Sequence, residues 1–126
     1  MEIGDVYLPE DKTIDDHPRI VISDPELNSE QVVLVNFTGF DGDYRDHSCV
    51  LEIGEYDWLT KKTCISYKDA CVVSQEAFDK LHECGLLKKL HAVSDSVLCK
   101  ILEGAGISDE LPNRCRRILA AQNLID

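Results

Sequence analysis

The chain changes its hydrophobic pattern near residue 74. Before that point, short runs rich in β-branched and aromatic residues are separated by turn-forming Gly, Pro, Asn and Asp. Closely spaced runs of this kind, with no helical periodicity between them, predict an antiparallel sheet that curls into a small barrel. The predicted strands are residues 6–8, 20–22, 32–37, 49–53, 63–67 and 71–73.

After Ser74 the apolar residues recur at spacings of three and four, which predicts about three helices. Ser74 is a suitable cap for the first helix, and Gly85 is suited to its left-handed end. The second helix is expected to begin at Ser94 or Asp95 and to end at Gly104, and the third to begin within residues 109–112. The predicted inward stripes are Ala77, Phe78, Leu81 and Cys84, then Val97, Leu98, Ile101 and Leu102, then Cys115, Ile118 and Leu119, with Arg114, Arg116 and Arg117 facing outward.

These patterns predict one α+β domain over residues 1–126, with a strand-rich barrel part at 1–74 and a helical part at 75–126. A chain of 126 residues that is 44% hydrophobic is large enough for one core. No apolar run approaches the roughly 20 residues of a membrane-spanning helix. The first residues lack the basic start and apolar stretch of a secretory signal, so a cytoplasmic location is expected.

The six cysteines are predicted to be reduced core residues. They form no Cys-x-x-Cys motif, and their spacing fits none of the common zinc motifs. We therefore expect no cofactor and no metal. The alternative is a metal site that uses His47 and Cys49 with Asp43 or Cys64.

The net charge of −11 is distributed unevenly. Residues 1–57 hold 15 acidic and 3 basic side chains, a balance of −12, whereas residues 58–126 hold 9 acidic and 10 basic, a balance of +1. Nucleic-acid affinity depends on cations that neutralise phosphates, so the first half should repel RNA unless its few cations converge. The alternative is that the acidic side chains coat solvated turns or face a basic partner.

Three short segments resemble the start of the MazF/PemK toxins. They are Gly4-Asp5-Val6, then His17-Pro18-Arg19-Ile20-Val21-Ile22-Ser23, then Val35-Asn36-Phe37-Thr38, and the weaker similarity extends to about residue 75. The resemblance implies an SH3-like barrel, usually dimeric, that cleaves single-stranded RNA without metal and is blocked by an acidic antitoxin protein. Thr38 matches the second catalytic position of that family, whereas the catalytic Arg that precedes Pro is His17 here.

Metal-free RNA cleavage requires a base, an acid and a cation for the charge that develops at phosphorus. Two His-Arg pairs, His17 with Arg19 and Arg45 with His47, have i, i+2 spacing. This spacing places both side chains of a pair on one face of an extended strand. With Thr38, they predict one cleft and a metal-independent endoribonuclease. The alternative is a non-catalytic acidic barrel module that binds a protein partner, with the pairs acting as surface ion pairs. The predicted catalytic residues are His17, Arg19, Thr38, Arg45 and His47.

Overall fold

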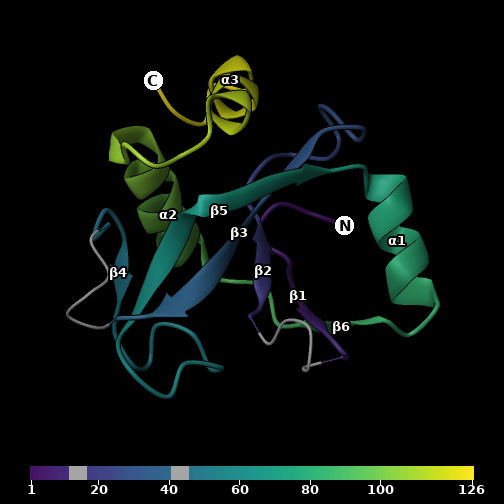
Figure 1. The fold of residues 1–126 in the computed structure, drawn as a ribbon, viewed down its shortest axis with the longest axis horizontal. Coiled ribbons are helices and arrows are strands. Elements are labelled where there is room, and N and C mark those ends of the chain that lie inside the picture. Colours follow the sequence, from purple (N-terminus) through teal and green to yellow (C-terminus); the bar gives the residue numbers. More distant parts are fainter. Residues whose placement is uncertain (12–16, 41–45) are drawn as a thin grey trace.

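The computed structural model describes residues 1–11, 17–40 and 46–126 and has an α+β fold (Figure 1). One six-stranded antiparallel sheet is packed against three helices. The elements in chain order are β1 (Val6–Pro9), β2 (Arg19–Val21), β3 (Val32–Gly39), β4 (Val50–Leu51), β5 (Thr63–Val73), α1 (Gln75–Glu83), β6 (Leu87–Leu90), α2 (Asp95–Ile107) and α3 (Asn113–Ala121).

The strand order is β4-β5-β3-β2-β1-β6, and each neighbouring pair is antiparallel. Within the described residues the two edge strands, β4 and β6, do not pair with each other, so the sheet is not closed and the predicted barrel is not confirmed. The two expected strands at 63–67 and 71–73 form one continuous strand, β5. Its pairing with β3 shifts register between Leu34 and Asn36, and such an irregularity bends and twists a strand.

The helices cover the two faces of the sheet unequally. The larger core contains side chains from α2 and α3, such as Ile101 and Leu119, packed with Phe37 and Tyr67 of the sheet. The smaller core on the other face contains Phe78 of α1. In Figure 1, α1 lies at the right of the view, while α2 and α3 lie at the left and top.

The predicted helix starts are close to the observed ones because the caps form. The Ser74 hydroxyl accepts a hydrogen bond from the Ala77 N–H at 3.1 Å, and Ser94 accepts one from the Val97 N–H at 3.2 Å. The prediction that α2 ends at Gly104 was wrong, because this glycine is a packing position rather than a stop. A Cβ there would lie 2.8 Å from the Cys49 Cβ and 2.9 Å from the Ser48 carbonyl.

Three other features differ from the expectations. Only Phe78 of the predicted α1 stripe is buried, because α1 packs through the edge-to-face contact of Phe78 with Tyr7, with ring centroids 5.0 Å apart. Strand β6 was not predicted, because two of its four residues are lysines and its pairing with β1 is a tertiary contact. Two of the cysteines expected in the core, Cys84 and Cys99, are exposed.

Within the part of the chain that the structure describes, no helix combines the length and the apolar character needed to cross a bilayer.

Candidate functional site at one end of the sheet

The pairing of β2 with β3 brings His17 and Thr38 together. Arg19 is paired with Asn36 in antiparallel register, so two residues further along His17 lies opposite Thr38. The hydrogen bond from the Phe37 N–H to the Pro18 carbonyl, at 3.4 Å, extends this pairing towards His17. Both side chains line one pocket of about 180 Å³. The other lining residues are Phe37, Gly39, Trp58, Thr60, Lys61 and Thr63.

Lys61 supplies the cation of this pocket. A Cβ at Gly39 would lie 3.1 Å from the Lys61 Nζ and 3.3 Å from its Cε, so the lysine side chain lies across the Gly39 backbone, one residue after Thr38. None of the described residues that line the pocket is acidic. Among the described lining residues, Lys61 therefore gives the pocket a positive charge, in a chain of net charge −11.

Aromatic rings flank the pocket. Trp58 stacks on Phe37 with ring centroids 6.2 Å apart, and it is 40% exposed. Beyond Thr38, Phe40 packs against His47 at 4.6 Å, and the Lys62 Nζ lies 4.3 Å from the centre of the Phe40 ring. Trp58 is exposed and Phe40 half-buried, and accessible rings near cationic side chains are features with which proteins bind single-stranded nucleic acid.

The loop that carries Trp58 and Lys61 is held at two points. The Tyr56 hydroxyl donates a 2.6 Å hydrogen bond to the His91 carbonyl, and burial raises the pKa of Tyr56 to about 12, so the hydroxyl keeps its proton. The Lys100 Nζ lies 2.9 Å from the Glu55 carboxylate. A backbone hydrogen bond at Glu52 and this ammonium lower the pKa of Glu55. These two contacts tie the loop to α2 and to the segment before it, so the loop presents Trp58 and Lys61 in a defined geometry.

Arg19 and His47, two of the other predicted catalytic residues, are not among the described residues that line the pocket. Arg19 lies two residues along the chain from His17, opposite Asn36, and its Nη1 donates to the Asn36 Oδ1 at 3.3 Å. Its strand alternation places it on the same face as Asn36 and Thr38. His47 is exposed and packs against Phe40. Arg45 lies outside the described residues.

Asp46 anchors the segment that leads to His47. Its carboxylate accepts hydrogen bonds from the Ser48 N–H at 3.0 Å and from the Ser108 hydroxyl at 2.6 Å. Burial by itself would raise the pKa of Asp46, but the hydrogen bonds from Ser108 and Ser48 outweigh it and lower the pKa. No sequence pattern singles out Asp46, because its partner Ser108 is 62 positions away.

The residues of the alternative metal site do not share one environment. Cys49 and Cys64 are buried, whereas His47 is exposed and Asp43 lies outside the described residues. Burial raises the pKa of the Cys49 thiol to about 11, which disfavours the thiolate that a metal requires. Among the side chains that the structure places, no group of three His, Cys, Asp or Glu could hold a metal ion.

Sequence reasoning missed Trp58 and Lys61. A signal for them exists, because the single tryptophan of the chain is followed closely by Lys61-Lys62, the first adjacent pair of basic residues. Basic residues next to an aromatic ring are a recognised pattern for binding nucleic acid.

Comparison with known proteins gave no matching family model, no significantly similar curated protein and no significantly similar solved structure. The function is therefore argued from the geometry of the pocket and from the chemistry of its side chains.

Proposed function

We propose that this protein is a MazF/PemK-like toxin, a metal-independent endoribonuclease that cleaves single-stranded RNA in the pocket between His17 and Thr38. One observation carries the proposal: an imidazole and a hydroxyl lie opposite each other in one pocket, and the Lys61 ammonium lies beside them. The SH3-like character of the fold belongs to the same proposal and is supported by the bent antiparallel sheet.

The pocket and His47, which packs against Phe40 beyond Thr38, offer the groups that this reaction needs. A base removes the proton of the RNA 2′-OH, the 2′-oxygen attacks phosphorus, and the bond from phosphorus to the 5′-oxygen breaks as an acid protonates that oxygen. Imidazole fits both roles because it titrates near neutral pH. In this proposal His17 and His47 share them, and Lys61 with the Thr38 hydroxyl stabilises the charge on the non-bridging oxygens.

In this proposal the aromatic rings contribute affinity for RNA, which offsets the repulsion between RNA phosphates and the acidic side chains. Trp58 and Phe40 offer faces on which bases stack, at about 1–3 kcal/mol per base. Lys61 and Lys62 supply local positive charge next to those rings. Because only these few cations contact phosphates, the proposal predicts weak binding and a shallow dependence of affinity on salt.

The direct test uses an unstructured, end-labelled RNA with EDTA present throughout. The wild-type chain should cut the RNA and leave a 2′,3′-cyclic phosphate and a 5′-OH. Thr38→Val, which keeps the shape and removes the hydroxyl, should cut at least about tenfold more slowly because a donor to the transition state is lost. His91→Ala is the matched control, since His91 is exposed and does not line this pocket.

Equal cutting by wild type and Thr38→Val would point to a contaminating nuclease and would contradict the proposal. Absence of cutting by a folded wild-type chain would favour the second candidate, a non-catalytic module that binds a protein partner. The balance of −12 over residues 1–57 is the observation that favours this candidate. It predicts that the protein binds a basic protein partner and releases no RNA fragments.

A further inference from the structure

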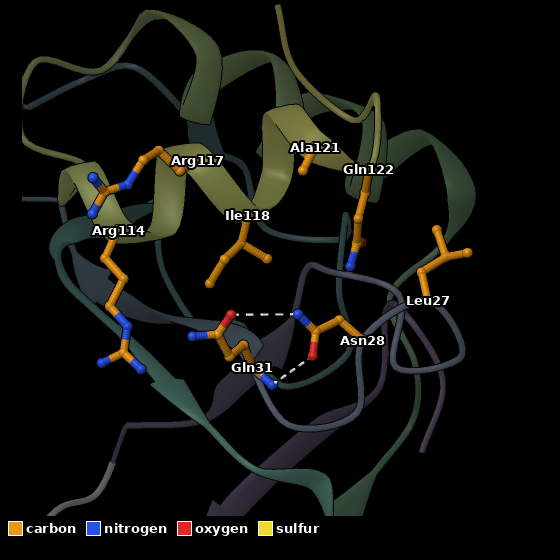
Figure 2. A pocket seen from close by; sticks show the side chains of 8 residues that line it. All are labelled: Leu27, Asn28, Gln31, Arg114, Arg117, Ile118, Ala121 and Gln122. Atoms are coloured by element: carbon orange, nitrogen blue, oxygen red, sulfur yellow. Dashed lines mark hydrogen bonds between the residues drawn. The ribbon is translucent and has the colours of Figure 1, made fainter.

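A second cavity lies at the opposite end of the sheet from the His17 pocket. It has a volume of about 620 Å³ and lies between α3 and the connection from β2 to β3. That connection leaves β2 and enters β3 at the ends away from His17 and Thr38. Figure 2 shows side chains from both elements around the cavity, among them Leu27, Asn28, Gln31, Arg114, Arg117 and Ile118.

Hydrogen bonds fix both walls of this cavity. The Gln122 Oε1 accepts from the Asp24 N–H at 2.7 Å, and its Nε2 donates to the Asp24 carbonyl at 3.3 Å, so α3 is fastened to the turn. On the turn side, the Asn28 Oδ1 accepts from the Gln31 N–H at 3.0 Å, and the Asn28 Nδ2 donates to the Gln31 Oε1 at 3.4 Å. These bonds leave the Nε2 donors of the Gln31 amide without a partner among the described residues.

The charges of the cavity are unusual for this chain. Lys62, Lys80, Lys89 and Lys100 each form an ion pair with a carboxylate. Arg116 donates to the carbonyls of Gly106 and Ser108. Arg114 and Arg117, in contrast, form no ion pair with any described residue, although the chain has 24 acidic and 13 basic side chains. In Figure 2 the Arg117 guanidinium extends to the upper left and the Arg114 guanidinium to the lower left of the cavity, and none of the described residues that line the cavity is acidic.

The positions of Arg114 and Arg117 on α3 are electrostatically unfavourable for the helix. Arg114 and Arg117 are three residues apart on one helix, and like charges at this spacing repel each other. Arg114 also lies in the first turn of α3, where the helix dipole disfavours a cation. A bound anion would remove both penalties.

We infer that this cavity binds a small molecule with a phosphate monoester, whose phosphate contacts Arg114 and Arg117 and whose remaining part lies over Ile118 towards Leu27. Forked guanidinium groups match phosphate oxygens in pairs, and the Gln31 amide adds a neutral donor. The 66% exposed Leu27 gives most of the apolar surface next to the charges, and the 9% exposed Ile118 adds a small part. The volume lies in the range of small-molecule sites, roughly 300–1,000 Å³. The inference does not depend on RNA cleavage.

The test is a titration of ¹⁵N-labelled protein, followed by NMR, with AMP, adenosine and inorganic phosphate as separate probes. AMP should shift the amide signals of residues 27–31 and 113–118, and it should bind more tightly than adenosine or inorganic phosphate. The Arg114→Gln/Arg117→Gln variant should bind AMP at least about tenfold more weakly, because two charge-assisted contacts are lost. Lys80→Gln/Lys88→Gln removes the same charge elsewhere and should bind as wild type does.

Several outcomes would overturn the inference. Equal weakening by Lys80→Gln/Lys88→Gln would mean that the binding is non-specific attraction. Shifts confined to residues 36–40 would place AMP in the His17 pocket instead, and equal affinity for inorganic phosphate would remove the role of Ile118. A tetraglutamate peptide that binds as tightly as AMP would identify a site for acidic peptides. Should the double variant be poorly folded, Arg117→Gln alone, whose side chain is exposed, gives the same comparison.

Discussion

The two ends of the sheet carry pockets with different chemistry. At one end, His17, Thr38 and Lys61 combine an imidazole, a hydroxyl and an ammonium group beside the exposed Trp58 ring. At the other end, Arg114 and Arg117 meet side-chain amides and aliphatic groups. A guanidinium keeps its proton in proteins, whereas an imidazole exchanges one near neutral pH. The first set of groups suits proton transfer, and the second suits only the binding of an anion.

The two pockets also differ in how the chain builds them. The His17 pocket joins β2, β3 and the loop before β5, so its geometry depends on strand register and on the anchoring of that loop. The Arg114 cavity needs one helix and one turn. A change at either end should therefore act locally, unless it disturbs the core that both ends share.

The largest expected effect is the loss of cleavage when the imidazole is removed. We expect His17→Ala to lower kcat/KM for RNA cleavage by about 10²–10⁴-fold, the usual contribution of a positioned acid or base. Arg114→Gln/Arg117→Gln should leave cleavage unchanged. Steady-state kinetics on one RNA, with thermal unfolding as a check on folding, measures both. Similar losses in the two variants would abolish the distinction between the two ends.

The next effect concerns the shared core. Gly104→Ala introduces a Cβ against the Tyr67 hydroxyl and the Ser48 carbonyl, and such overpacking costs about 1–3 kcal/mol. Urea denaturation should show this loss in the free energy of unfolding. Gly106→Ala is the matched control in the same helix, because its nearest contact would be the Ile125 Cβ at an ordinary 3.9 Å. It should be neutral or slightly stabilising, since alanine favours helix.

A smaller, pH-dependent effect is expected at Asp46. The pKa of Asp46 is lowered from its ordinary value of 3.8 in the folded state, so its carboxylate stabilises the fold above that pH, and this contribution is lost as the pH falls through the folded-state pKa. Ser108→Ala removes a hydrogen bond to the carboxylate and should cost about 1–2 kcal/mol at pH 7. The difference from wild type should shrink in urea titrations below pH 3.8. A difference independent of pH would show that Ser108 acts only through its hydrogen bond with the Glu110 N–H.

The smallest effect is expected for the variant Gly39→Ala. A Cβ there meets the end of the flexible Lys61 side chain, which can move away, so the free energy of unfolding should barely change. Displacement of the ammonium should lower kcat/KM by less than about tenfold, since the other catalytic groups stay in position. The same variant should bind AMP at the Arg114 cavity as wild type does. Weaker AMP binding would mean that the two ends are coupled.

Local signals predicted much of this fold. Ser74 and Ser94 cap helices where expected, and the predicted stripe of α3 is buried. In α2 the predicted Val97 and Ile101 are buried, Leu98 and Leu102 are half-buried, and Gly104 and Ala105 are buried without having been predicted. The failures share one physical cause, which is tertiary contact. Gly104 is required by the close approach of α2 to Ser48 and Cys49, and β6 forms only because β1 offers it a partner.

The candidate site likewise combines residues that local sequence signals predicted and a residue that only tertiary contacts bring into place. His17 and Thr38 could be placed together from the sequence, because consecutive strands usually pair and their i, i+2 positions share a face. Lys61 could not, because a separate loop, fastened to α2 through Lys100 and to His91 through Tyr56, brings it to Gly39. The outward direction of Arg114 and Arg117 was predicted, but the turn that they face across the cavity was not.

The hydrogen bonds between Asp24 and Gln122 can form only late in the synthesis of the chain. They join positions 98 residues apart, so almost the whole chain must leave the ribosome before α3 can be fastened to the turn. Contacts of such long range close a large loop and tend to form late. A nascent chain can thus complete the His17–Thr38 pairing long before the far cavity exists.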